Sequence, residues 1–164
     1  MRTTKVLSAL AALGLSLGAA SAQAQSGSIT ASATVLTAIT VANGANLAFG
    51  NVTPGVNKTV AITDAGAGRF DVTKSAATLV QLSFTLPANL TSGVNNLPIG
   101  TWTGGWNTIN NAGSATAFTP SAGGTSLPSS GANLFVFVGA TVSPAAAQVA
   151  ATYNGNVTMQ VVYL

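Results

Sequence analysis

The residues that most enzymes use for chemistry are nearly absent from this chain. It has no histidine and no cysteine, and its only acids are Asp64 and Asp71. The commonest general bases, thiolate nucleophiles and transition-metal ligands are therefore missing. A glycosidase would have to use both aspartates, and a calcium site would need one or both with loop carbonyls. Aspartate commonly begins or ends a turn, so a structural role is favoured. We expect no enzyme activity, no catalytic residue and no cofactor, and the calcium alternative stays open.

Two tryptophans are the remaining chemical handle. Trp102 and Trp106 bracket Thr103-Gly104-Gly105, a stretch typical of a turn. Such a turn would expose an indole ring, whose amphipathic face can stack on a sugar. The favoured interpretation places one or both rings in the core at the end of a strand, and the other makes them candidate glycan contacts.

The first 24 residues predict a cleaved export signal. Arg2 and Lys5 precede an apolar run from Val6 to Ala20, and small-x-small cleavage patterns follow it. This run is too short for a comfortable membrane span, and no later segment approaches its length. We therefore expect residues 1–24 to be a signal peptide, and residues 25–164 to form a single domain without a transmembrane segment.

Charge is scarce in the predicted mature chain. Charged residues make up 4% of the whole sequence, whereas about a quarter is usual. After the signal, three cations (Lys58, Arg69 and Lys74) stand against two anions, which leaves a net charge of +1. This is not the clustered basic face that nucleic-acid binding needs. Sparse charge gives little repulsion between copies, so the surface suits a protein that packs among copies of itself.

Beyond the signal, apolar residues recur with a period of two, which is typical of β-strands with one covered face. Ile29, Ala31, Ala33 and Val35 alternate with Thr and Ser, and the pattern continues to Val41. The other predicted strands are Val80–Leu86, Leu134–Val138, Val157–Tyr163 and the shorter Leu47–Phe49, Thr59–Thr63, Arg69–Thr73 and Ile99–Thr103, with a weak strand around Phe118 in a loop-rich stretch. Turn residues separate them, which indicates an all-β sandwich or barrel. We expect a core containing Phe49, Leu82, Phe84, Val136 and Val161.

One pair of strands concentrates the charges. Thr59–Thr63 and Arg69–Thr73 are predicted to form a hairpin through the loop 64–68, and charged residues lie in or beside it. Charges on an edge hairpin discourage pairing between sheets. The hairpin is therefore interpreted as a protected edge, with a merely solvated loop as the alternative.

Two stretches of the sequence carry a family resemblance. The first is Leu47-Ala48-Phe49-Gly50-Asn51-Val52-Thr53-Pro54-Gly55, after the alternating run that ends at Val41. The second is the strand 134–142, followed by Tyr153-Asn154-Gly155 and the closing strand. Their order and spacing resemble a family of secreted bacterial domains of unknown function, related to spore coat protein U and to chaperone–usher pilins. The resemblance covers residues 29–164.

The resemblance implies an immunoglobulin-like, pilin-like β-sandwich of a Gram-negative bacterium, exported through the periplasm to the cell surface or medium and associated with fimbriae. It also implies a C-terminal assembly strand with Val157, Met159, Val161 and Tyr163, the last resembling the penultimate tyrosine of pilins. Two departures matter: the chain lacks the usual disulfide, and Ala151 stands where pilins place glycine. A periplasmic chaperone and outer-membrane assembly machinery therefore stay open as partners.

The leading hypothesis is a structural subunit of a surface fibre whose partners are other copies of itself. Ile29, Ala31, Ala33 and Val35 would form a donor strand that adds to a neighbouring sandwich. The same pattern equally fits a first strand that completes its own sandwich. The alternative function is a monomeric secreted adhesin or carbohydrate-binding module that uses Trp102 or Trp106.

Overall fold

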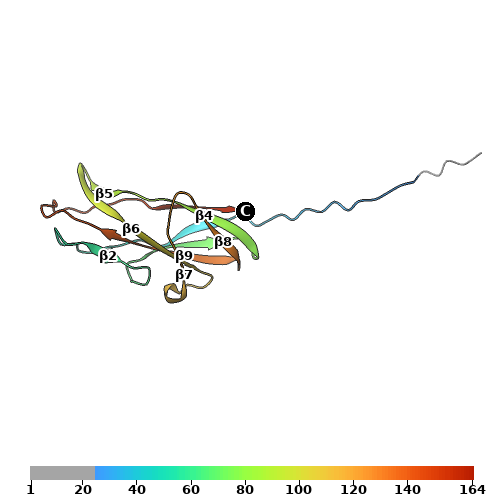
Figure 1. Cartoon of the computed structure of the whole chain (residues 1–164), viewed down its shortest axis with the longest axis horizontal. Helices are drawn as coiled ribbons and strands as arrows, with labels where there is room; N and C mark the ends of the chain where they lie inside the picture. Colours follow the sequence, from blue (N-terminus) through green and yellow to red (C-terminus); the bar gives the residue numbers. More distant parts are fainter. Residues whose placement is uncertain (1–24) are drawn as a thin grey trace, which may run out of the picture. The chain divides into compact units, whose positions relative to one another are not determined.

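The computed structural model describes residues 25–164, and the predicted signal peptide lies outside the described residues (Figure 1). The chain divides into two units at Val35. Residues 25–34 are extended, belong to no strand and are exposed. The second unit, residues 35–164, holds every strand. Its first residues, 35–39, also lie outside any strand, so the alternating run predicted from Ile29 becomes a strand only at Thr40.

A large antiparallel sheet forms most of the second unit. Its strands lie in the order β1 (Thr40–Ala45), β3 (Gly68–Thr73), β9 (Asn133–Val142), β6 (Asn95–Asn107) and β5 (Asn89–Ser92), with β2 (Lys58–Val60) paired to β9 and β7 (Thr116–Phe118) paired to β6. The long strand β9 lies at its centre and is buried along most of its length. A strand covered on both faces needs apolar residues at successive positions, which is the pattern of its sequence.

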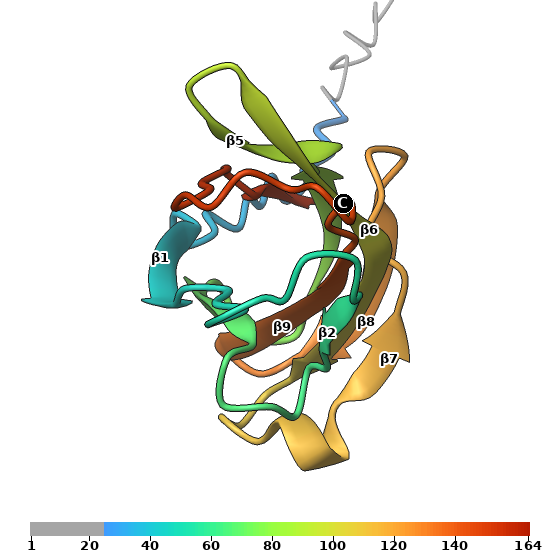
Figure 2. The same ribbon diagram turned by 90° about the vertical axis from the view of Figure 1, so that its left-hand side faces the viewer.

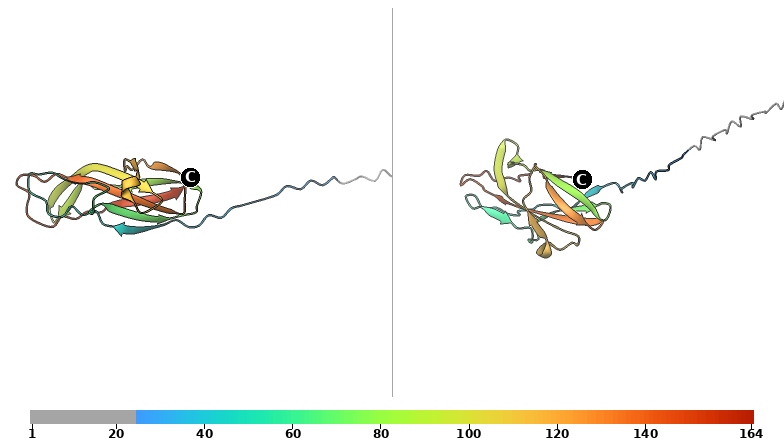
Figure 3. Two further views of the ribbon diagram at one scale, coloured as in Figure 1. Left: turned by 90° about the horizontal axis from the view of Figure 1, so that it is seen from below. Right: turned by 45° about the vertical axis from the view of Figure 1, so that its right-hand side comes forward.

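A smaller sheet packs against the first. In it, β4 (Thr78–Thr85) lies between β10 (Thr158–Tyr163) and β8 (Thr125–Ser130). Val80, Leu82 and Phe84 point inward and contact residues of β9 and β3 in one core cluster. The two sheets form a curled, sandwich-like arrangement whose strands run along a common long direction (Figures 2 and 3). The predicted all-β sandwich-like character is confirmed. In residues 25–164 the helical structure is one 3-10 turn, Ala112–Ser114.

The predicted hairpin at the charged residues is wrong. Both β2 and β3 pair with β9, at Ala140–Val142 and Asn133–Val138 respectively, so they follow each other along one edge of that strand. The other edge of β3 is covered by β1, so β3 is not an edge strand. Gly139 lies where β2 ends, and a Cβ there would collide with the carbonyl of Val60. The missing side chain therefore lets the two backbones approach closely.

Other boundaries also differ from the prediction. Thr103-Gly104-Gly105 lies inside the 13-residue strand β6 and forms no turn. A Cβ at Gly104 would lie 2.7 Å from the ring of Phe118, so this glycine makes room for the aromatic side chain of β7. Leu47–Phe49 is not a strand, whereas β5 and β8 are strands that the alternating pattern did not predict. Glycine therefore marks close packing here as well as turns.

Candidate functional site

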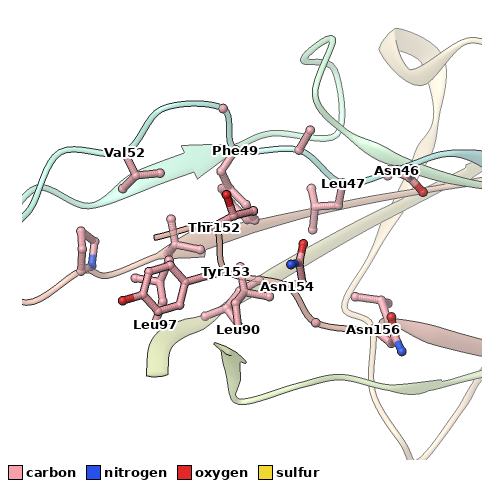
Figure 4. Close-up of a pocket in the computed structure, with 18 of the residues that line it drawn as sticks. Asn46, Leu47, Phe49, Val52, Leu90, Leu97, Thr152, Tyr153, Asn154 and Asn156 are labelled. Carbon is pink, nitrogen blue, oxygen red and sulfur yellow. The ribbon is translucent and has the colours of Figure 1, made fainter. Parts of the chain in front are cut away.

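The second unit contains a groove between two segments that lie mostly outside strands. Residues 43–54 form its first rim and include the end of β1, and residues 148–157 form its second rim and lead into β10. The cavity between them has a volume of about 870 Å³. Figure 4 shows Leu47, Phe49 and Val52 on the first rim opposite Thr152, Tyr153 and Asn154 on the second.

The floor of the groove is apolar. Leu97, Ile99 and Val142 are buried beneath it and form a core cluster with Ala140. Leu47, Phe49, Leu90 and Tyr153 pack against this cluster but are only partly buried. Large apolar side chains that line a groove and remain partly exposed mark an interaction surface for a protein, a membrane or a ligand.

The backbone of each rim is hydrogen-bonded on its outer side. On the first rim, the amide of Ala48 donates to the carbonyl of Gly66 at 2.8 Å. On the second rim, Asn154 exchanges two backbone hydrogen bonds with Thr91 of β5, at 2.8 and 2.9 Å. Within residues 25–164, no backbone hydrogen bond joins residues 43–54 to residues 148–157. The two rims thus face each other across a gap without pairing.

The strands that continue the rims are edge strands too. β1 pairs only with β3, and β10 pairs only with β4, among the strands of residues 25–164. An edge strand presents a row of free backbone donors and acceptors, which is a template for another strand. One edge of each sheet is therefore open on the side of the molecule that holds the groove.

The open edges of the two sheets meet at the end of the sandwich that holds the C-terminus. There the hydroxyl of Tyr163 donates to the carbonyl of Thr37 at 2.7 Å and accepts from the amide of Ser75 at 2.7 Å. The amide of Thr37 donates to Oγ of Ser75 at 2.6 Å. At the opposite end, the amide of Gly55 donates to the carbonyl of Ala145 at 3.1 Å. Hydrogen bonds therefore connect the chain before β1 to β10 at one end, and the chain beyond the first rim to the chain before the second rim at the other.

The predicted site residues fall in three places. Met159, Val161 and Tyr163 lie on β10 and point inward, whereas Val157 precedes this strand and lines the groove. The proposed donor residues Ile29, Ala31, Ala33 and Val35 are all exposed, with Ile29 97% and Val35 94% accessible. Trp102 and Trp106 lie on β6, are half-buried and pack against the core.

The two aspartates are engaged in local structure. Oδ2 of Asp64 accepts the amide of Ala61 at 2.8 Å, which closes a turn. Both carboxylate oxygens of Asp71 accept hydrogen bonds from Arg69, at 2.7 and 3.1 Å. Each carboxylate therefore has its own partner, Ala61 for Asp64 and Arg69 for Asp71. In the part of the chain that the structure describes, no cluster of three or more potential metal ligands occurs.

The structural roles of several residues in this region could not be predicted from the sequence. Lys74 is one of the charged residues that the sequence predicts at an exposed edge, but it is 2% exposed. Its ammonium donates to the carbonyls of Ser75, Thr78 and Ser130. Thr37 and Ser75 are ordinary polar residues in the sequence. Tyr153 belongs to the Tyr-x-Gly element, which contributes to the family resemblance but does not by itself predict a groove. Contacts over such sequence distances follow from the fold alone.

The comparisons with known proteins add no relative. No family model, curated protein or solved structure matches the chain. Residues 25–164 contain no helix that has the length and hydrophobicity needed to cross a membrane.

Proposed function

We propose that this protein is a structural subunit of a bacterial surface fibre that assembles by β-strand addition. Residues 25–36 of one copy fill the groove of the next copy. The observation that carries the proposal is the pair of unpaired rims, each hydrogen-bonded only on its outer side, above an apolar floor. An added strand would satisfy both backbones and cover the floor at once.

The order of the strands supports an immunoglobulin-like fold that lacks its last strand. In constant-type immunoglobulin domains, strands A, B, E and D form one sheet and strands C, F and G form the other. Here β1, β3, β9 and β6 follow the A-B-E-D order, and β4 and β10 take the places of C and F. Among the strands of residues 25–164, β10 pairs with β4 alone, so the G position beside it has no occupant there. A strand from another copy would complete the sandwich there.

Residues 25–36 have the properties of such a strand. Their odd-numbered residues from Ile29 to Val35 are apolar, the residues between them are Thr and Ser, and all are exposed. At about 3.3 Å per residue, this segment spans roughly 40 Å when it is fully extended. An Ile and a Val at the ends of the row bury the most area, and the two alanines fit a shallower middle.

The scarcity of charge fits the same function. Few like charges would oppose the close packing of copies, because charged residues make up 4% of the sequence. The proposal includes export through the predicted signal peptide to the cell surface of a Gram-negative bacterium. A periplasmic chaperone that fills the groove before assembly belongs to the same proposal. No contact of Trp102 or Trp106 favours the carbohydrate-binding alternative, because their rings pack on the core.

Two aspartate substitutions test the proposal. Ile29→Asp places an unpaired charge in the groove of the next copy, which is a severe penalty, so polymers should be lost. Thr30→Asp places the same charge in solvent, so polymers should form as in the wild type. The measurement is the high-mass ladder of unboiled samples in gel electrophoresis, with filaments counted by electron microscopy. A wild-type protein that stays a folded monomer at high concentration would overturn the proposal, as would polymer formation by Ile29→Asp.

A further inference from the structure

Tyr163 is at the centre of a clasp that fixes Thr37, the residue that directly follows residues 25–36. The clasp consists of Thr37, Ser75 and Tyr163, joined by the three hydrogen bonds of 2.6 to 2.7 Å described above. Both the amide and the carbonyl of Thr37 are hydrogen-bonded within this clasp. Three separate segments of the chain, with sequence separations of 38, 88 and 126 residues, meet at this point.

The turn that presents Ser75 is itself held firmly. Lys74, with 2% exposure, places its ammonium 3.2 Å from the carbonyl of Ser75, 3.1 Å from that of Thr78 and 3.3 Å from that of Ser130. The hydroxyl of Thr78 donates to the carbonyl of Ser75 at 2.6 Å. Charge-assisted bonds of this kind are among the stronger ones in proteins. The clasp therefore has a rigid support.

The position of the clasp bears on which groove residues 25–36 can reach. β1 leaves Thr40 toward the first rim of the groove, so residues 25–36 can enter their own groove only by reversing direction between Leu36 and Ile39. Such a reversal needs a turn at Thr37, whose two backbone groups are already bonded in the clasp. Ile39 is half-buried against the core, which also restrains this stretch.

We infer that Tyr163 is a positioning residue that directs strand donation to another copy and away from its own groove. This inference rests on the proposed function. The aromatic ring of Tyr163 packs on the core, and its hydroxyl holds Thr37 extended. Without the hydroxyl, the turn back into the same groove competes, and a closed monomer forms that can neither donate nor accept a strand.

Tyr163→Phe tests the inference because it keeps the ring and removes only the hydroxyl. Two hydrogen bonds of modest net strength are lost, so the ratio of closed monomer to polymer should rise about tenfold. Ser75→Ala removes one bond of the clasp and should give a smaller shift. The control is Thr59→Val, which removes a hydroxyl pair with Thr141 on β2 and β9, away from the clasp.

Two readouts separate positioning from general stability. The first is the yield of high-mass species, and the second is hydrogen exchange of residues 29–35 in the monomer fraction. Tyr163→Phe should protect these amides in the monomer, whereas they exchange freely in wild-type and Thr59→Val monomers. Equal polymer yield and equal exchange in Tyr163→Phe and wild type would overturn the inference and leave the proposed function intact. Absence of wild-type polymers would overturn the proposed function itself.

Discussion

The two sides of this sandwich are built from the same kind of strand but differ in completeness. On the closed side, Leu82 and Val136 have 0% exposure, and β9 is hydrogen-bonded along both edges. On the open side, Phe49 and Val161 are only partly buried, and β1 and β10 are paired along one edge. The core is therefore more completely buried where a strand is paired along both edges than beside β1 and β10, which are paired along one edge.

Two segments with the same alternating pattern of apolar and polar residues differ in burial in the same way. Val80, Leu82 and Phe84 alternate with polar residues on β4 and are at most 3% exposed. Ile29 to Val35 alternates in the same way, yet Ile29 is 97% exposed. Period two specifies which residues share a face, because side chains alternate across a strand. It does not specify whether that face meets its own chain or another.

The largest effect on stability is expected on the closed side. Phe84→Ala removes a ring that is 3% exposed and lies 5.7 Å from the ring of Phe118, between centroids. The free energy of unfolding should fall by about 3–5 kcal/mol, since a large cavity forms in a packed core. Val161→Ala on the open side should cost clearly less, because its side chain is already partly exposed. Denaturant titration of both variants as monomers would contradict the comparison if the two costs were equal.

A smaller effect is expected where β2 and β3 meet β9. Gly139→Ala brings a Cβ against the carbonyl of Val60 and within 2.7 Å of Oγ1 of Thr103. The backbone has to shift, which should cost roughly 1–3 kcal/mol. Gly100 on β6 is the matched control, because nothing lies within 4 Å of a Cβ there. Gly100→Ala should leave the thermal midpoint unchanged or slightly higher, and a fall as large as that of Gly139→Ala would show that close packing is not the cause.

The sequence was a good guide to the closed side. Of the five predicted core residues, Leu82, Phe84 and Val136 are buried, and each lies in a strand whose pattern is local and regular. Phe49 and Val161 are the two that stay partly buried, and both lie on the open side. Under the proposed function, a strand from another copy covers these two side chains. A missing neighbour cannot be read from local periodicity.

The pairing of the strands was harder to predict than the alternation of apolar and polar residues along them. Lys58 and Arg69 lie in segments that are close in sequence, so a hairpin was the simplest prediction, but both segments pair with β9. The ammonium of Lys74 donates to the carbonyl of nearby Thr78 and to that of Ser130, 56 positions away, whereas its charge predicted exposure. The clasp at Tyr163 likewise joins residues that are up to 126 positions apart. Long-range pairing depends on the whole topology, which short motifs do not contain.

The smallest change in monomer stability is expected at the groove floor, where the comparison is sharpest. Phe49→Ala removes a side chain that packs on the second core cluster but is partly exposed. In the monomer, the loss should be about 1–2 kcal/mol, since only part of its apolar area is buried. In an assembled fibre, the donor strand would cover the rest of the ring, so the variant should lose more stability as a polymer than as a monomer. The measurement is the thermal midpoint of each form, separated by size, for wild type and variant. Equal losses in the two forms would mean that Phe49 meets no donor strand, and the open side would then be a surface that stays uncovered.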